Sequence, residues 1–179
     1  MTDVRVALLR GVNVGKAKRI AMADLRKIVE DLGYREVRTL LNSGNVVFTV
    51  PANRRDDPAK RIEQSMTKRL GVESRVIVLT RAEVRAMVEG NPLARIADNP
   101  SLLLAMVLRD ARTASSLREL ATQEWAPEAM TLGKRVAYLW CPGGTIKSRL
   151  AAAVNRVLND AGTARNLATM TKLHAMMSE

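Results

Sequence analysis

Two groups of polar residues near glycines have the composition of an anion-binding site. The first group combines residues 10–16 (RGVNVGK) with residues 42–45 (NSGN). Arg10 and Lys16 would neutralise negative charge, while amide, hydroxyl and backbone N–H groups would orient the ligand. The alternative is that these residues only close turns, because Gly44 can adopt positive φ and Asn side chains can hydrogen-bond to nearby backbone. The residues expected to contact a ligand are Arg10, Asn13, Ser43 and Asn45.

The second group combines residues 141–149 (CPGGTIKSR) with residues 163–166 (TARN). Both segments lead into expected helices, whose first turns offer free N–H donors and the positive end of a dipole. Lys147 and Arg165 would be repelled by that dipole, so their presence there favours an anion between them. Asn166 also has the character of a helix N-cap, which is a purely structural alternative. The residues expected to contact a ligand are Lys147, Ser148, Arg165, Asn166 and Lys172.

The first half of the chain predicts the elements that would position the first group. Residues with apolar side chains recur at helical spacing from Met22 to Leu32, and Gly33 ends that helix. A second helix begins at Pro58 and ends at Gly71. Strands are predicted over residues 4–9, 36–41, 45–50 and 75–79.

The second half repeats the order of elements. A strand over residues 101–108 is followed by a helix that Ser115 or Ser116 would cap. The predicted hairpin turns at Gly133-Lys134, where glycine suits the first position of a type II′ turn. The next helix has an apolar stripe formed by Ile146, Leu150, Val154, Val157 and Leu158. The remaining elements are strands over residues 128–132, 135–140 and 163–165 and a last helix over residues 167–177.

The predicted fold class is α+β, with two ferredoxin-like (βαββαβ) subdomains packed together, a connecting helix and a C-terminal helix. The expected divisions are residues 1–80 for the first subdomain, 81–100 for the connection and 101–179 for the second subdomain with the last helix. In this topology the first and third strands are antiparallel neighbours. The loop after the first strand and the following hairpin therefore lie at the same end of the sheet, which brings the first polar group together.

Composition limits the classes of function. The chain has 179 residues and a net charge of +11, which would attract polyanions. No segment reaches the roughly 18–20 apolar residues of a membrane span, and the chain enters a strand too early for a signal peptide. A single cysteine, Cys141, allows no internal disulfide, and a buried structural thiol is favoured over a nucleophile. We therefore expect a soluble cytoplasmic protein without a membrane partner.

The sequence lacks complete versions of several catalytic and cofactor-binding motifs. Residues 11–16 are one residue short of a phosphate loop, and Ala17 occupies the place of the magnesium-binding hydroxyl. One Cys and one His cannot supply a zinc site, so we expect no metal and no cofactor. Neither polar group contains a carboxylate or His that could act as a general base, which disfavours hydrolysis and leaves catalysis open. Ferredoxin-like sheets bind RNA through sheet aromatics, and the expected central strands contain only Phe48.

Longer segments resemble a known bacterial family, the domain of unknown function 1697. Residues 8–48 (LLRGVNVG to NSGNVVF) are similar to the family pattern of LRGINVGG followed by QSGNVVF, and residues 163–173 are similar to TRNW…T…KL. The departures are Lys16 for a usual glycine, Asn42 for Gln, and Leu167 for Trp. The resemblance implies paired ferredoxin-like subdomains and implies no particular activity.

These observations favour a protein that binds a small phosphate-bearing anion through the two polar groups. The first alternative is a nucleic-acid-associated protein that acts through its basic surface, without an aromatic stacking platform. The second alternative is a scaffold for protein interactions. The expected assembly is a monomer or a small homo-oligomer.

Overall fold

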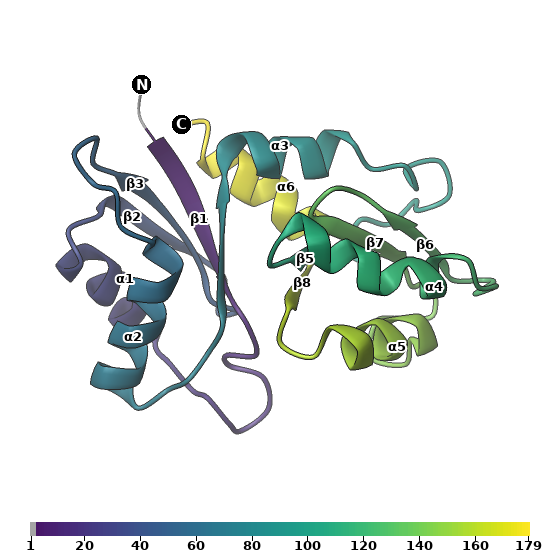
Figure 1. Cartoon of the computed structure of the whole chain (residues 1–179), viewed down its shortest axis with the longest axis horizontal. Coiled ribbons are helices and arrows are strands. Elements are labelled where there is room, and N and C mark those ends of the chain that lie inside the picture. Colours follow the sequence, from purple (N-terminus) through teal and green to yellow (C-terminus); the bar gives the residue numbers. More distant parts are fainter. Residues whose placement is uncertain (1–2) are drawn as a thin grey trace. The chain divides into compact units, whose positions relative to one another are not determined.

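The computed structural model describes residues 3–179 and has an α+β fold with two four-stranded antiparallel sheets (Figure 1). The chain divides into two compact units. The first extends to Glu83 and also includes Leu173–Glu179, and the second is Val84–Lys172. The divisions fall within the helices α3 (Arg81–Glu89) and α6 (Leu167–Met176), so each unit contains part of both helices.

In the first unit, two helices alternate with the strands of one sheet. The strand order is β2-β3-β1-β4, and all neighbours are antiparallel. The predicted pairing of the first and third strands is present, with Val6 opposite Val47. The elements are β1 (Asp3–Leu9), α1 (Met22–Asp31), β2 (Arg35–Leu40), β3 (Asn45–Val50), α2 (Pro58–Leu70) and β4 (Val76–Thr80).

Both helices cover the same face of this sheet (Figure 1). Their apolar stripes, including Leu25 of α1 and Met66 of α2, form one buried cluster with Phe48 of β3. The helix α2 begins where the sequence predicts, because the Asp57 carboxylate accepts the Ala59 N–H at 3.0 Å and caps the helix. Burial of these stripes is the main source of stability for the unit.

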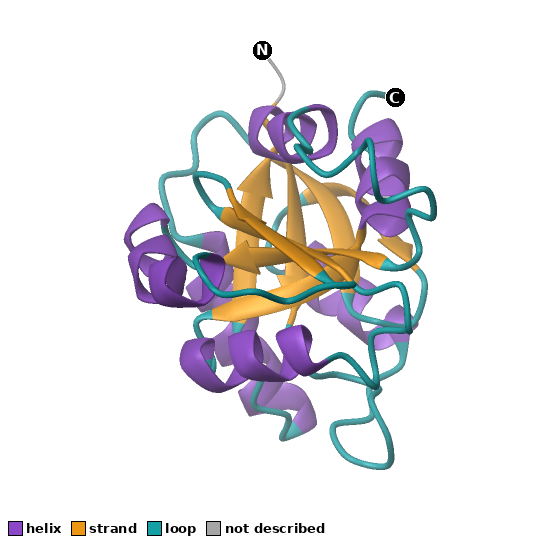
Figure 2. Cartoon of the chain, turned by 90° about the vertical axis from the view of Figure 1, so that its right-hand side faces the viewer, coloured by secondary structure: helices purple, strands orange, loops and turns teal. Residues whose placement is uncertain are grey.

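The second unit contains the second sheet, with strand order β6-β7-β5-β8. Its helix α5 packs on one sheet face through Leu150 and Val154, which join a buried cluster with Met106 and Leu139. Figure 2 shows the strands and helical segments of the chain coloured by secondary structure. The elements are β5 (Leu103–Leu108), η1 (Ala111–Leu117), α4 (Arg118–Ala121), β6 (Ala129–Leu132), β7 (Val136–Trp140), α5 (Arg149–Leu158) and β8 (Gly162–Asn166).

The helix predicted to begin at Ser115 or Ser116 begins earlier and in another form. A 3₁₀ helix (η1) starts after Asp110, whose carboxylate accepts the Thr113 N–H at 2.9 Å, and the short α4 follows it. The Ser115 hydroxyl donates backwards to the Arg112 carbonyl at 2.7 Å instead of capping. Asp110 is therefore the true start signal, and the prediction of a serine cap was wrong.

The helix α5 begins later than its apolar pattern suggested. The Ser148 hydroxyl accepts the Ala151 N–H at 2.8 Å and fixes Arg149 as the first helical residue. Ile146 lies before this cap and is 100% exposed, so its assignment to the buried stripe was wrong. An N-cap serine overrides one apolar residue that continues the helical period.

The connection between β6 and β7 also differs from the prediction. A type II′ turn requires positive φ at Gly133, and the positive-φ glycines of residues 3–179 lie elsewhere. The Gly133 N–H donates to the Val136 carbonyl at 2.7 Å. A Cβ at position 133 would lie 2.8 Å from Val136 Cγ1, so packing explains this glycine. Among the described residues, no helix has the length and apolarity to cross a membrane.

Candidate anion-binding loops

The first polar group is brought together at one end of the first sheet. The Leu9 N–H donates to the Gly44 carbonyl at 2.9 Å, which joins the end of β1 to the β2–β3 turn. The Asn13 side chain donates to the Asn42 carbonyl at 2.7 Å across the same gap. The sequence-based expectation that the loop after β1 lies beside the hairpin turn is therefore met by direct contacts.

Asn13 holds the loop after β1 in shape. Its amide nitrogen also donates to the Ile20 carbonyl at 2.9 Å, and its amide oxygen accepts the Ile20 N–H at 2.9 Å. Its φ of 56° is left-handed, a conformation that asparagine tolerates better than most residues. The Asn13 amide thus closes the loop and joins it to the hairpin, which is a positioning role.

Ser43 and Asn45 organise the hairpin turn. Asn45 is fully buried, and its amide donates to the Leu40 carbonyl at 2.9 Å and to the Ser43 hydroxyl at 3.0 Å. These two hydrogen bonds are those expected of a side chain that closes a turn. The turn-closing interpretation accordingly accounts for much of the chemistry of this polar run.

The exposed part of the loop after β1 carries the positive charge. Every residue from 14 to 19 is exposed, and this stretch includes Lys16, Lys18 and Arg19. Arg10 stands at the half-buried start of the loop, where its carbonyl accepts the Ser74 hydroxyl at 2.8 Å. Residues 4–23 contain no Asp or Glu, so the loop has no acidic residue of its own.

In the second unit, the start of residues 141–149 and the end of residues 163–166 lie at the same end of the sheet. The Cys141 N–H donates to the Leu102 carbonyl at 3.0 Å, and Asn166 lies opposite Leu104 in the neighbouring strand pair. Asn166 caps α6, because its side-chain oxygen accepts the Thr169 N–H at 2.8 Å. Ser148 caps α5 in the same way, so both polar side chains have structural partners.

The side chain of Arg165 lies on the opposite face of this sheet from Ser148. Arg165 pairs with Ala105, whereas the neighbouring Leu104 and Met106 belong to the α5-side cluster that also contains Cys141. Adjacent strand residues point to opposite faces, so Arg165 points away from α5. The structure does not bring these side chains into one cluster, and Lys147 and Lys172 are exposed.

Arg165 is itself buried, with 8% of its surface exposed. Its guanidinium donates to the Thr163 hydroxyl at 3.2 Å and to the Ala164 carbonyl at 2.8 Å. Burial lowers the pKa of Arg165 to about 10, so the side chain stays protonated at neutral pH. A buried, hydrogen-bonded arginine of this kind contributes to the packing of the sheet face.

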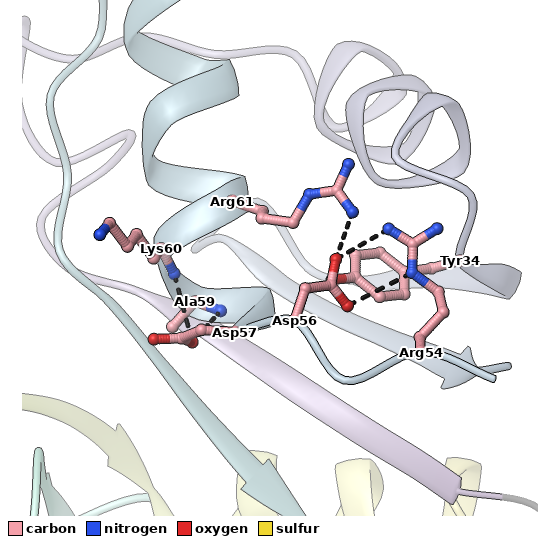
Figure 3. A network of polar contacts seen from close by, with 7 residues as sticks. All are labelled: Tyr34, Arg54, Asp56, Asp57, Ala59, Lys60 and Arg61. Atoms are coloured by element: carbon pink, nitrogen blue, oxygen red, sulfur yellow. Dashed lines mark hydrogen bonds and ion pairs between the residues drawn. The ribbon is translucent and has the colours of Figure 1, made fainter. Parts of the chain in front are cut away.

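Arg54, Asp56 and Arg61 form a cluster of charged side chains at the start of α2, which no motif in the sequence indicates (Figure 3). Arg54 Nη2 contacts the Asp56 carboxylate at 2.8 Å, and Arg61 forms an ion pair with the same carboxylate. The Arg54 guanidinium also lies 5.1 Å from the centre of the Tyr34 ring. Two arginines share one carboxylate here, and together they fasten the β3–α2 loop against Tyr34.

Tyr34 connects this cluster to the core and predicts an alkaline stability effect. Burial, followed by the charge of Asp56, raises the pKa of Tyr34 to about 12. Since the unfolded phenol titrates near 10, the unfolded state loses its proton first, and stability falls between about pH 10 and pH 12. Tyr34→Phe should remove up to about 2 kcal/mol of this loss. Urea unfolding of both proteins at pH 9, 10, 11 and 12 measures the free energy of unfolding. An equal decrease with pH in both proteins would contradict the prediction.

The burial of Cys141 and the grouping of possible metal ligands bear on nucleophilic and metal-binding chemistry. Burial raises the pKa of the Cys141 thiol, which favours the protonated, unreactive form. Within residues 3–179, no three His, Cys, Asp or Glu side chains are grouped so that they could hold a metal ion. The expected structural role of Cys141 agrees with its complete burial.

Comparison with known proteins places the chain in a family. A family model described as a protein of unknown function, DUF1697, matches residues 1–138. The structure of a conserved bacterial protein, SP0830 from Streptococcus pneumoniae, is similar with a TM-score of 0.80 and 20% sequence identity over 99% of both chains. At that identity the likeness concerns the fold, and none of the curated proteins matches the chain. Because the family model matches most of its residues, this protein belongs to the DUF1697 family.

Proposed function

We propose that the protein binds a small phosphate-bearing anion at the loop after β1 and the adjoining hairpin turn. The observation that carries this proposal is the exposed stretch of residues 14–19, which presents Lys16, Lys18 and Arg19. The Asn13 hydrogen bonds hold this stretch in a defined shape. Three cations on a pre-shaped loop attract an anion at a lower entropic cost than cations on a flexible tail.

The backbone of the same loop supports the proposal. Gly11 has a φ of 66°, Asn13 of 56°, Gly15 of 61° and Lys18 of 50°, so left-handed residues recur along it. Alternation of left-handed and right-handed residues turns successive N–H groups toward one side and forms concave sites for anions. A Cβ at Gly11 or Gly15 would meet no atom within 4 Å, which leaves room for a ligand beside the backbone.

We also propose that each unit is a ferredoxin-like subdomain. The order of elements in the first unit and the central β1–β3 pair support this assignment. The second unit has the corresponding strand order, β6-β7-β5-β8, with η1 and α4 in place of one longer helix. The subdomain boundaries at residues 1–80 and 101–179, and a ligand contact by Lys147, Ser148, Arg165, Asn166 or Lys172, remain predictions.

Charge-matched variants test the anion site. One variant carries Lys16→Gln, Lys18→Gln and Arg19→Gln, and the control carries Lys60→Gln, Lys68→Gln and Lys134→Gln at exposed positions on other segments. Both lose three positive charges, so only position differs. With inorganic pyrophosphate as the titrant, we expect the loop variant to lose at least about tenfold in affinity, while the control changes by less than about twofold. Isothermal titration calorimetry at low ionic strength measures both.

Two results would contradict the proposal. The first is a wild-type protein that does not bind pyrophosphate, and the second is an equal loss in both variants. An equal loss would show that the overall charge acts without a site, as expected for non-specific polyanion binding. Titration of a short single-stranded oligonucleotide at two salt concentrations would then show a steep decrease in affinity with salt for both variants. Base stacking is not expected, because Phe48 of β3 lies in the cluster beneath the helices.

A further inference from the structure

The face of the first sheet opposite α1 and α2 contains a groove of about 680 Å³. Val4 lies opposite Thr49, and Val6 lies opposite Val47, so these side chains share this face, while Phe48 points to the helices. A volume of this size suits a small molecule. The sheet and the start of α3 contribute to the lining with Val4, Glu36, Arg38, Val47, Thr49 and Arg81.

One wall of the groove holds an oriented carboxylate. Glu36 has a φ of 51° at an irregularity in the β2–β3 pairing, between Arg35 and Arg38. Such a bulge redirects a strand side chain. The Thr49 hydroxyl donates to the Glu36 carboxylate at 2.5 Å, which anchors it to the sheet residues at the base of the groove.

Beside Glu36, Arg38 already binds a carboxylate. Its guanidinium forms an ion pair with the Glu179 side chain and also donates to the Met176 carbonyl. Met176 is the last residue of α6 and Glu179 lies in the segment after it, both in the part of the chain drawn in yellow in Figure 1. The Glu179 side chain is 64% exposed, so its ion pair is weak and easily exchanged.

The charges of the groove define the ligand that would suit it. Arg38 and Arg81 balance Glu36 and Glu179, so departure of the Glu179 side chain would leave one unmatched positive charge beside an anchored carboxylate. A ligand with a carboxylate at Arg38 and an ammonium group at Glu36 would neutralise the charges of both side chains. The apolar side chain of Val4 is half-buried and lines the groove near these groups, whereas Val47 is almost fully buried.

We propose that this groove binds a small zwitterion of the amino-acid type with an apolar side chain. The ligand carboxylate replaces that of Glu179 on Arg38, the ammonium group contacts Glu36, and the apolar side chain rests on Val4. The segment after α6 then acts as an intramolecular competitor for Arg38. This site is separate from the loop after β1, and neither proposal depends on the other.

L-leucine is the probe, with isothermal titration calorimetry as the measurement. Glu179→Gln should bind leucine about threefold tighter than the wild-type chain, because the side-chain carboxylate that pairs with Arg38 is gone. Adding Arg38→Gln to that variant should weaken binding at least about tenfold, and Glu36→Gln should weaken it by a similar factor. Arg85→Gln, which removes an exposed arginine paired with Glu89, is the matched control and should leave affinity unchanged.

Two analogues separate the parts of the proposal. Leucinol lacks the carboxylate and 4-methylpentanoate lacks the ammonium group, so both should bind at least about tenfold more weakly than leucine. Circular dichroism confirms folding, and Arg38→Lys, which keeps the charge, should bind better than Arg38→Gln. The proposal is overturned if Glu179→Gln fails to bind leucine, if Arg38→Gln has no effect in a folded protein, or if 4-methylpentanoate binds as tightly as leucine.

Discussion

Replacing Gly44 with alanine should lower the free energy of unfolding by about 3 kcal/mol. Gly44 has a φ of 77°, which strains any residue with a Cβ. An added Cβ would lie 2.6 Å from Val12 Cγ2 and 2.7 Å from Leu9 Cβ, and both neighbours are buried. Neither can move without disturbing the core, so strain and overpacking act together. Urea unfolding at neutral pH measures the loss.

Gly15→Ala is the matched control for this effect. Gly15 also has positive φ, at 61°, but its added Cβ would meet no atom within 4 Å. The control should therefore lose only the conformational part, about 1 kcal/mol. If the two variants lose equal stability, the close approach of the hairpin turn to β1 and Val12 does not contribute, and the described contact between the two loops is wrong.

Removing the Asn13 side chain should have the second largest effect. Asn13→Ala loses hydrogen bonds to Ile20 and to the Asn42 carbonyl, and it places a Cβ without a polar group at a φ of 56°. We expect a loss of about 2 kcal/mol in the free energy of unfolding, since hydrogen bonds of this kind contribute about 1 kcal/mol each and part of the site is exposed. The same variant should weaken pyrophosphate binding, because the cationic loop loses its support.

Asn13→Gly separates the loss of hydrogen bonds from the backbone strain of a residue with a Cβ at positive φ. Glycine removes the same hydrogen bonds but adopts positive φ without strain, so it should be more stable than the alanine variant by about 0.5 to 1 kcal/mol. Pyrophosphate affinity should fall in both variants. Wild-type affinity in a folded Asn13→Gly protein would show that the fixed loop shape is unnecessary, and the cations alone would then explain any binding.

The periodic parts of the fold could be predicted from the sequence. The spacing of apolar residues predicts α1, and glycines predict the C-terminal ends of α1 and α2. The order of elements along the chain predicts that β1 lies beside β3. Two of the errors arose where one polar side chain overrides the apolar pattern, and the third where packing against Val136 explains Gly133. Asp110 starts η1 before the serines that the sequence favours, and Ser148 delays α5 beyond Ile146.

The sites were harder to predict because they depend on side-chain direction and on long-range contacts. Successive side chains of a strand point to opposite faces of the sheet, so Arg165 points away from Ser148 although both lie near the same end of the sheet. The ion pair between Arg38 and Glu179 joins residues 141 positions apart, and no local pattern indicates it. By contrast, the contact between Asn13 and the hairpin turn followed from topology alone, since antiparallel neighbours bring those loops together.

A nuclear magnetic resonance titration of the ¹⁵N-labelled chain with inorganic pyrophosphate tests the anion site most directly. The largest amide shifts should fall on residues 11–19 and 42–44, because those backbone groups line the two joined loops. They should be absent from the same titration of the Lys16→Gln, Lys18→Gln, Arg19→Gln variant. Shifts spread evenly over the basic surface, or centred on another segment, would contradict the account.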